Sequence, residues 1–297
     1  MAYVYKFNEY LKKTFGGKVW KVPVEAGFTC PNRDGLKGEH GCIYCSVDSF
    51  DGSEGGAIAR QVETRIEKLK KRNIGKYIVY FQSYSNTYCD LHTLRERIES
   101  SLVDEGIVAV HIGTRPDVID REKLEYLKEL NERYEVVLEY GLQSANDDTL
   151  KAINRGHTVQ DFIDAVELTH EYGLKVCAHV IFGLPNDTVE DMMESVRLLN
   201  RLKVHSVKFH HLHIVRNTKL ADMYAEGKVH VLSPDEYLGI LSDALAVLDK
   251  DIVVARLSGD AAGDTLIAPV WEISKGELEL KLMNLMDVKG VSQGSRS

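Results

Sequence analysis

Short runs rich in β-branched and aromatic residues alternate along the chain with amphipathic segments. The amphipathic segments, around 58–72, 91–104, 120–132, 159–172 and 188–202, have apolar residues three and four positions apart. This alternation predicts βαβ units and a parallel sheet, and it favours an open or closed α/β barrel, with a doubly wound sheet as the alternative. The six predicted strands are KVWKVPV (18–24), YIVYF (77–81), IVAVHIGT (107–114), EVVLEYGLQ (135–143), LKVCAHVIFGL (174–184) and SVKFHHLHIV (206–215).

Three of the five cysteines lie in one segment after the first predicted strand, GFTCPNRDGLKGEHGCIYCSVDSF (27–50). The loops that follow the strands form the functional face in either architecture, so we expect Cys30, Cys42 and Cys45 on that face. The pair in CIYC brings two thiolates round one tight turn onto one metal centre. The turns PNRDG and KGEHG give Cys30 the freedom to fold back toward them.

The residues of this loop leave three interpretations open. A structural zinc site would use the three cysteines with His40 as the fourth ligand. A 4Fe-4S cluster would use three thiolates and leave the fourth iron open for a small ligand. A buried, inert cysteine cluster is disfavoured because the loop is polar and rich in glycine. The cysteine count alone does not separate zinc from iron-sulfur.

The expected compartment also bears on the cysteines. The segment MAYVYKFNEYLKKTFGG has no secretory signal pattern, and no stretch reaches the roughly 18 uncharged apolar residues of a membrane span. We therefore expect a cytoplasmic protein without a membrane partner, where five cysteines favour metal binding or redox chemistry over disulfides. The formal net charge of -8 predicts no general polyanion-binding surface. The basic run at 68–72 is expected on the solvated face of a helix.

Polar segments at the predicted strand ends share the face of the cysteines. FQSYSNTY (81–88) suits an amino-acid-like or ribose-like group, and VIFGLPNDT (180–188) contains a glycine that lets a flat ligand approach the backbone. Each segment alone also fits a structural role, but together they concentrate polar groups beside the cysteines. The remaining segments, HIGTRPD (111–117), EYGLQS (139–144) and INRGHT (153–158), carry Arg115, Glu139, Gln143 and Arg155.

In this order, these motifs resemble those of the radical S-adenosylmethionine (radical SAM) enzymes. The resemblance is closest to the small YhcC/YtqA-like family, which is related to the catalytic subunit of Elongator. It continues more weakly through KFHHLHIVRNTKLADMY (208–224) and VVARLSGD (253–260). It implies a partial (β/α)6 TIM-like barrel of the radical SAM type over residues 1–215, with the cluster-binding loop at 27–50. It also implies an α/β extension over residues 216–297 that covers the open side of the barrel.

The resemblance further implies that Cys30, Cys42 and Cys45 hold a 4Fe-4S cluster whose open iron takes the amino and carboxylate groups of S-adenosyl-L-methionine. An electron from a reductase, flavodoxin or ferredoxin would then cleave the sulfonium and give a 5'-deoxyadenosyl radical. The chain departs from other relatives in its eleven-residue cysteine spacing and at Gly113 and His179, where some carry Glu and Asp. The implied cofactor-binding residues are Tyr44, Gln82, Ser83, Tyr84, Arg115, Glu139, Gln143, Arg155, Gly183 and Pro185.

The resemblance fixes no catalytic residue, and the candidates are Cys89, Tyr84, His211 and His213. The Cys89 thiol lies just after the second predicted strand and could give a hydrogen atom, although a partly buried loop thiol is the simpler interpretation. Cys177 is expected to be a small core residue. In KFHHLHIV, strand alternation predicts Phe209, His211 and His213 on one side and Lys208, His210 and Leu212 on the other.

Relatives of the Elongator subunit act on the C5 substituent of wobble uridine, so the resemblance implies tRNA as a partner. It also implies that the chain processes a carboxymethylaminomethyl group toward aminomethyl. The acidic net charge weakens this hypothesis. The alternatives are a small-molecule or protein substrate and, outside catalysis, a zinc-stabilised barrel that acts as a binding module. In the extension we expect a helix at 233–250, a strand at 251–260, a helix at 272–288 and a frayed polar tail.

Overall fold

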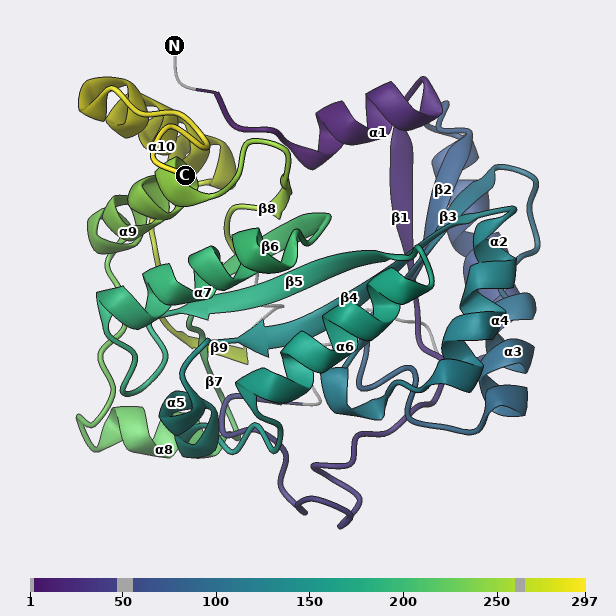
Figure 1. Ribbon diagram of the computed structural model, residues 1–297, viewed down its shortest axis with the longest axis horizontal. Coiled ribbons are helices and arrows are strands. Elements are labelled where there is room, and N and C mark those ends of the chain that lie inside the picture. The colour runs from purple at the N-terminus through teal and green to yellow at the C-terminus, as the bar shows by residue number, and fades with distance from the viewer. Residues whose placement is uncertain (1–2, 47–55, 260–264) are drawn as a thin grey trace.

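The computed structural model describes residues 3–46, 56–259 and 265–297, and seven parallel strands within them form one curled sheet. The sheet has the strand order β1-β2-β3-β4-β5-β6-β8, and helices cover its convex side (Figure 1). The predicted α/β partial barrel is therefore confirmed. The strands are β1 (Val19–Val24), β2 (Lys76–Phe81), β3 (Ile107–Thr114), β4 (Glu135–Gln143), β5 (Lys175–Phe182), β6 (Ser206–His211) and β8 (Val253–Arg256).

The helices between successive strands lie close to the predicted segments. Four helices begin with a capping box, in which a Ser or Thr side chain and an acidic side chain three residues later satisfy free backbone N–H groups. The helices are α1 (Phe7–Phe15), α2 (Ile58–Lys70), α3 (Leu91–Glu99), α4 (Arg121–Asn131), α5 (Asp147–Ala152), α6 (Val159–Glu171), α7 (Val189–Leu202), α8 (Lys219–Ala225), α9 (Pro234–Val247) and α10 (Lys275–Lys289).

The two faces of the sheet have different environments. On the convex face, alternate strand residues such as Leu138 and Tyr140 pack in the main apolar core beneath the helices. On the concave face, the end nearest the strand N-termini is closed by α1, whose Tyr10 and Leu11 pack against Ile78 and Ala109. Helix α1 therefore covers the end of the concave face that is opposite the carboxyl ends of the strands.

The predicted strand 206–215 is shorter in the structure. Strand β6 ends at His211, and β7 (Ile214–Val215) pairs instead with β9 (Leu266–Ala268) in a separate antiparallel sheet. The predicted alternation is wrong beyond this point, because the His213 ring contacts both His210 and His211, at centroid distances of 4.5 and 4.3 Å. The chain turns where continuous pairing stops.

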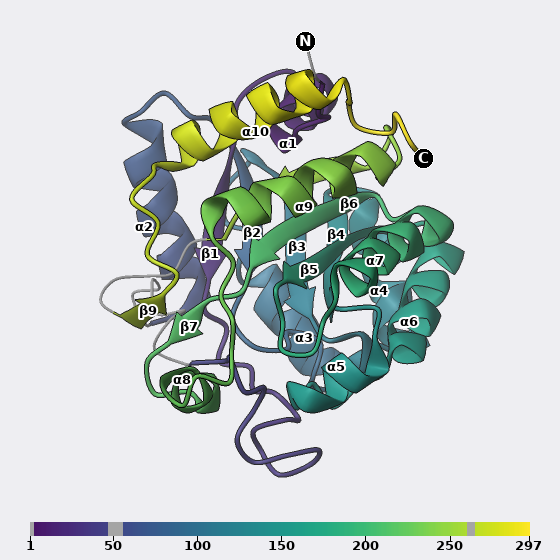
Figure 2. The same cartoon turned by 90° about the vertical axis from the view of Figure 1, so that its left-hand side faces the viewer.

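Residues after 215 contribute to the main sheet and to its convex cover. Strand β8 pairs in parallel with β6, and α10 packs along α9 (Figure 2). The division at residue 215 and the covering role of the extension stay predictions. Residues 47–50 of the predicted cluster loop and Asp260 lie outside the described residues. In the described part of the chain, no helix combines the length and apolar character needed to cross a bilayer.

The predicted frayed tail is wrong, because Gln293 anchors it and is only 5% exposed. Its side-chain amide donates to the carbonyl oxygens of Asp249 and Ile252 at 2.7 and 2.8 Å, and its Oε1 accepts from the Tyr5 backbone N–H at 2.8 Å. These hydrogen bonds tie both ends of the chain to the loop before β8.

The Gln293→Ala substitution is expected to lower the free energy of unfolding by about 2–4 kcal/mol, since three backbone groups lose their partner. Urea unfolding monitored by circular dichroism measures the effect. The exposed Gln160, whose side-chain amide donates to Asp164, gives the matched control Gln160→Ala. Equal unfolding midpoints for the two variants would contradict the packed tail.

Candidate active site

The cysteine loop lies beyond the carboxyl end of β1, and Arg33 holds its two halves together. The Cys42 carbonyl accepts from the Cys45 N–H at 2.9 Å, which closes the turn predicted for CIYC. The Arg33 backbone N–H donates to the Cys30 carbonyl at 2.8 Å, and its Nη2 donates to the Cys45 carbonyl at 2.7 Å. These hydrogen bonds link the Cys30 part of the loop to the Cys45 part, and the common metal site of the three cysteines stays a prediction.

The cysteine loop docks on the segment after α5. The Ile43 N–H donates to the Ile153 carbonyl at 3.0 Å, and the Asn154 side-chain amide donates to the Gly41 carbonyl at 2.8 Å. In return, the Asn32 side-chain amide donates to the Asn154 carbonyl at 2.6 Å. This docking places Arg155 directly beside the cysteines.

Arg155 is buried beside Cys42. Its Nη1 lies 3.6 Å from the Cys42 Sγ, its Nη2 donates to the Gly141 carbonyl at 3.0 Å, and its Nε has no hydrogen-bond partner. A Cβ at Gly141 would lie 2.5 Å from the Gln143 amide and 2.6 Å from Arg155, so only glycine allows both side chains to approach. Burial alone would lower the pKa of Arg155, but Tyr44 and Cys42 raise it, so the guanidinium stays charged.

The three thiols do not form a preassembled tetrahedral zinc site. Zinc bonds of about 2.3 Å in a tetrahedral site bring sulfurs to about 3.8 Å from one another. The sulfurs of Cys30, Cys42 and Cys45 are not all within 4.8 Å of one another, and His40, the predicted fourth zinc ligand, is exposed. Burial and then Cys42 raise the pKa of the Cys45 thiol, which a cationic metal group would reverse.

The segment after β2 also adjoins the cysteine loop, because the Ser85 N–H donates to the Thr29 carbonyl at 3.2 Å. Ser83 is buried, whereas Gln82 and Tyr84 are exposed. Tyr84 has a φ of 65°, and Gln143 at the end of β4 has a φ of 72°, so both predicted cofactor residues occupy left-handed turns. The cofactor contacts predicted for these residues stay predictions.

Gly183 and Pro185 lie in the loop after β5, at the same end of the sheet. Gly183 has a φ of 86°, and a Cβ at this position would approach the Leu232 side chain to 3.0 Å. Both residues are partly exposed. The loop therefore exposes its backbone where the sequence predicts contact with a flat ligand. Tyr44, which precedes Cys45 in the cysteine loop, is also half-buried.

Arg115 is 2% exposed and fully engaged within the protein. Its Nε and Nη2 donate to the Asp117 carboxylate at 2.8 Å, and its Nη1 donates to the Arg155 carbonyl at 2.6 Å. Burial alone would raise the pKa of Asp117, but Arg115 and then Lys37 lower it to about 2. The structure therefore gives Arg115 a positioning contact with Arg155, and its predicted contact with the cofactor stays a prediction.

Glu139 lies at the centre of a polar layer on the concave face. Its Oε1 accepts from Lys21 at 3.1 Å and from His111 at 2.8 Å, and its Oε2 accepts from His179 at 2.8 Å and pairs with Lys208. We call Lys21, His111, Glu139, His179 and Lys208 the lysine layer. These residues come from five strands, and β1, β4 and β6 are not neighbours, so their side chains meet across the curl of the sheet.

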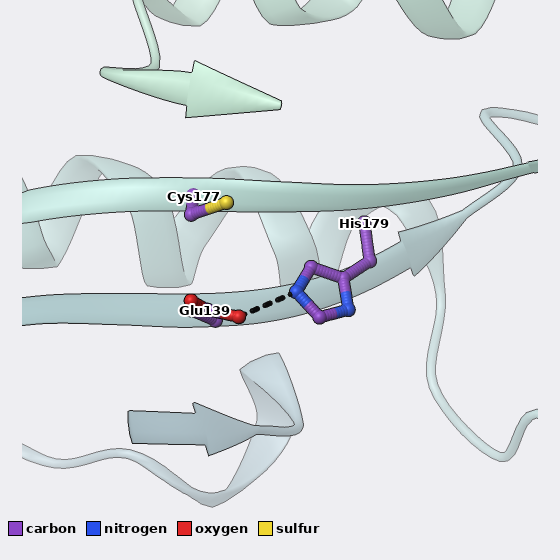
Figure 3. Close-up of side chains that lie close together, drawn as sticks. All are labelled: Glu139, Cys177 and His179. Carbon is purple, nitrogen blue, oxygen red and sulfur yellow. Dashed lines mark hydrogen bonds and ion pairs between the residues drawn. The ribbon is translucent and has the colours of Figure 1, made fainter. Parts of the chain in front are cut away.

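The predicted cofactor contact of Glu139 stays a prediction, and its carboxylate is fully buried against these four partners. Cys177 is buried as predicted, but it faces the lysine layer beside Glu139 and His179 rather than the apolar core (Figure 3). Sequence reasoning missed Lys21, His111 and Lys208 as site residues. The sequence feature that could have identified them is a charged or polar residue on one face of an otherwise apolar strand.

The catalytic candidates other than Tyr84 lie in apolar or aromatic surroundings. Cys89 is half-buried and packs against the main core, and burial raises the pKa of its thiol. His211 stacks on Trp271 at a centroid distance of 3.9 Å and contacts the Tyr237 ring, while its Nε2 lies 2.8 Å from that of His213. Catalytic roles for these residues stay predictions.

The lysine layer is expected to make the protein acid-sensitive. Burial lowers the pKa of both His111 and His179 to about 4. The positive charge of Lys21 adds to this shift at His111, and that of Lys208 adds to it at His179. Unfolded histidines titrate near 6.5, so between about pH 6.5 and 4 the unfolded chain binds more protons and stability falls as the pH is lowered. For His111, 3% exposed, the loss is of the order of 3 kcal/mol.

Urea unfolding between about pH 7.5 and 5 measures this slope. His111→Gln keeps a donor to Glu139 and should flatten the slope, whereas the exposed His92→Gln should leave it unchanged. A wild-type stability that stays constant over this range would show that the histidines are not held neutral.

Residues 35–199 match the Radical SAM superfamily, and residues 204–284 match the Radical_SAM C-terminal domain. The chain belongs to the radical SAM superfamily. This radical SAM protein is 35% identical to the uncharacterized protein YtqA of Bacillus subtilis (strain 168) over 292 residues, which cover 97% of this chain and 90% of YtqA. The predicted resemblance is thereby confirmed.

This radical SAM protein is also similar to part of one curated enzyme and to one solved structure. It is 27% identical to the tRNA uridine(34) acetyltransferase of Methanocaldococcus infernus, over 59% of this chain and 33% of that protein. The structure of the archaeal M. infernus Elp3 with an N-terminal deletion superposes with a TM-score of 0.71 and 22% identity, over 93% of this chain and 64% of Elp3. The structural match supports the partial-barrel fold.

Proposed function

We propose that this chain binds a 4Fe-4S cluster through Cys30, Cys42 and Cys45 and cleaves S-adenosyl-L-methionine reductively to act on tRNA. One observation carries the proposal. Three free cysteines share one loop, and the buried, charged side chain of Arg155 lies beside one of them, Cys42. When bound, the cluster and S-adenosyl-L-methionine would supply a 5'-deoxyadenosyl radical that removes a hydrogen atom from the substrate.

The protein residues would bind and orient these groups. The three thiolates would hold the cluster, and Arg155, whose Nε has no partner, would pair with the cofactor carboxylate. Gln143, Gln82, Ser83 and Tyr84 would contact its polar groups, and Gly183 and Pro185 would back the adenine. Arg115 would act indirectly, because it fixes the backbone of Arg155.

The proposed substrate is the C5 side chain of the wobble uridine in tRNA, processed from carboxymethylaminomethyl toward aminomethyl. The similarity to a tRNA uridine(34) acetyltransferase supports tRNA as the partner. A flavodoxin, a ferredoxin or their reductase would supply the electron, in the cytoplasm. Small-molecule or protein substrates are the competing outcomes of the test below.

The experiment is anaerobic reconstitution with iron and sulfide, followed by S-adenosyl-L-methionine, dithionite and tRNA. Mass spectrometry should detect 5'-deoxyadenosine, and its yield should rise with tRNA that carries carboxymethylaminomethyluridine but not with tRNA that lacks this group. A yield that no tRNA alters would contradict the tRNA substrate. A protein that binds zinc and forms no 5'-deoxyadenosine would contradict the enzyme.

A further inference from the structure

The lysine layer contains more positive than negative charge. Lys21 and Lys208 both pair with Glu139, and within residues 3–46, 56–259 and 265–297 no other acid pairs with either lysine. Although burial alone would raise the pKa of Glu139, the two lysines lower it well below its usual value, so the carboxylate is ionised. His111 and His179 are neutral near pH 7. Two lysine side chains therefore share one carboxylate. Burial lowers the pKa of Lys21 although Glu139 opposes the shift, and a second anion in the layer would favour its charged form.

This charge excess is buried, where an unbalanced charge is costly. The Lys208 side chain is 5% exposed, and that of Glu139 is not exposed at all. Arg256 of β8 lies opposite Lys208 in the strand register and adds further positive charge to the same region. An anion that enters the layer would balance the excess.

A metal ion would not balance it. Donor atoms of Glu139, Cys177 and His179 lie within 4.8 Å of one another, on adjacent strands β4 and β5 (Figure 3). However, both carboxylate oxygens of Glu139 already contact an ammonium group, so a cation there would be repelled by two neighbouring positive charges. The electrostatics of the lysine layer favour an anion.

The lysine layer also contains a hydrogen-bond donor that a bound anion could use. The Lys208 ammonium has three N–H groups and donates to Glu139 and, at 3.0 Å, to the Tyr80 hydroxyl, which leaves one for a ligand. The side chains of Lys21 and His179 are 26% and 30% exposed, so solvent reaches the layer. Arg256 and Phe7 also line a cavity of about 220 Å³ between α1, β8 and α10. The Lys21 ammonium lies 5.2 Å from the centroid of the Phe7 ring.

We propose that the lysine layer binds one carboxylate group of the substrate, with Lys208 as its main donor and Glu139 as the fixed counter-ion that orients Lys208. The assignment rests on the proposed function, in which the uridine side chain ends in a carboxylate. The carboxylate of S-adenosyl-L-methionine is assigned to Arg155, beside the cysteines, so the two anions occupy different places.

The first test uses [13C]acetate as the probe, with the reconstituted protein and saturating S-adenosyl-L-methionine. Broadening of the acetate signal should show binding to the wild type and a loss of affinity of about tenfold or more in Lys208→Met, since a charge-assisted hydrogen bond is removed. Lys208→Arg should retain binding. Lys228→Met, which removes an exposed lysine paired with Glu226, is the matched control and should leave binding unchanged.

Three results would overturn the proposal. The first is that the double variant Lys208→Met/Glu139→Gln, which lacks both charges, binds acetate as the wild type does. Lys208 would then be only the structural partner of Glu139. The anion would be that of the cofactor if Lys208→Met weakened S-adenosyl-L-methionine binding tenfold. If Lys208→Met does not fold, Lys208→Gln, which keeps a hydrogen-bond donor but removes the charge, provides the comparison. Absence of acetate binding to the folded wild type would also overturn the proposal.

A second probe separates this proposal from the proposed function. The nucleoside 5-carboxymethylaminomethyluridine should bind the wild type about tenfold more tightly than its carboxamide, which lacks the carboxylate but keeps the amine, and Lys208→Met should remove the difference. Lys208-dependent acetate binding without discrimination between the nucleosides would support the anion site and reject the tRNA substrate. Discrimination that survives in Lys208→Met would reject the lysine layer as its origin.

Discussion

Cys42→Ala is expected to lose cluster iron and to reduce 5'-deoxyadenosine formation below roughly one hundredth of wild type, because no other group replaces the missing thiolate. The fold should persist, since Cys42 lies in a loop that is also anchored by the hydrogen bonds of Asn32, Ile43 and Asn154. Iron analysis, visible absorbance and far-ultraviolet circular dichroism after anaerobic reconstitution measure the three quantities.

Cys89→Ala is the matched control, because it removes a half-buried thiol outside the cysteine loop. It should retain the iron content of the wild type. Its 5'-deoxyadenosine yield also tests whether Cys89 has a catalytic role. Full iron in Cys42→Ala would show that Cys42 is not a cluster ligand and would remove the main support for the proposed function.

Glu139→Gln is expected to lower the free energy of unfolding by about 3–5 kcal/mol, because it leaves Lys21 and Lys208 without their shared counter-ion. The acid dependence has a defined sign. The lowered pKa of Glu139 contributes stability above about pH 4.3, and this contribution is lost as the pH falls toward the folded pKa. Urea unfolding at neutral pH measures the main effect.

The control for this prediction is an acid with two partners at the surface. Glu194 pairs with Arg197 and Arg201 and is 42% exposed, so Glu194→Gln should cost no more than about 1 kcal/mol. Similar losses in the two variants would show that water screens the lysine layer as it screens a surface pair. That result would also weaken the argument for a bound anion.

Local patterns predict most of the fold. Strands β1 to β6 and five of the six α-helices between them, all but α5, have strong periodicity, so their positions follow from the sequence with small shifts at the ends. Helix α5 has only six residues and carries too few apolar positions to show a period. The separate pairing of β7 with β9 joins segments about 50 residues apart, which no local pattern specifies.

The candidate site is predictable in a different way. The order of the motifs predicts the cysteine loop and Arg155, and the structure places them in contact. The lysine layer is not predictable from spacing, because Lys21, Glu139 and Lys208 meet only after the sheet curls. Parallel strands buried on both faces are normally continuous apolar runs, so an isolated charge within such a run is the signal that identifies these residues.

The packed tail places both ends of the chain at one site. The Tyr3 N–H donates to the Ser292 hydroxyl at 3.2 Å, and both ends lie on the side of the molecule opposite the cysteine loop (Figures 1 and 2). A tether or a fluorophore attached at either end would therefore leave the cysteine loop unobstructed. Immobilised through these ends, the molecule would present its cysteine loop to a ligand arriving from solution.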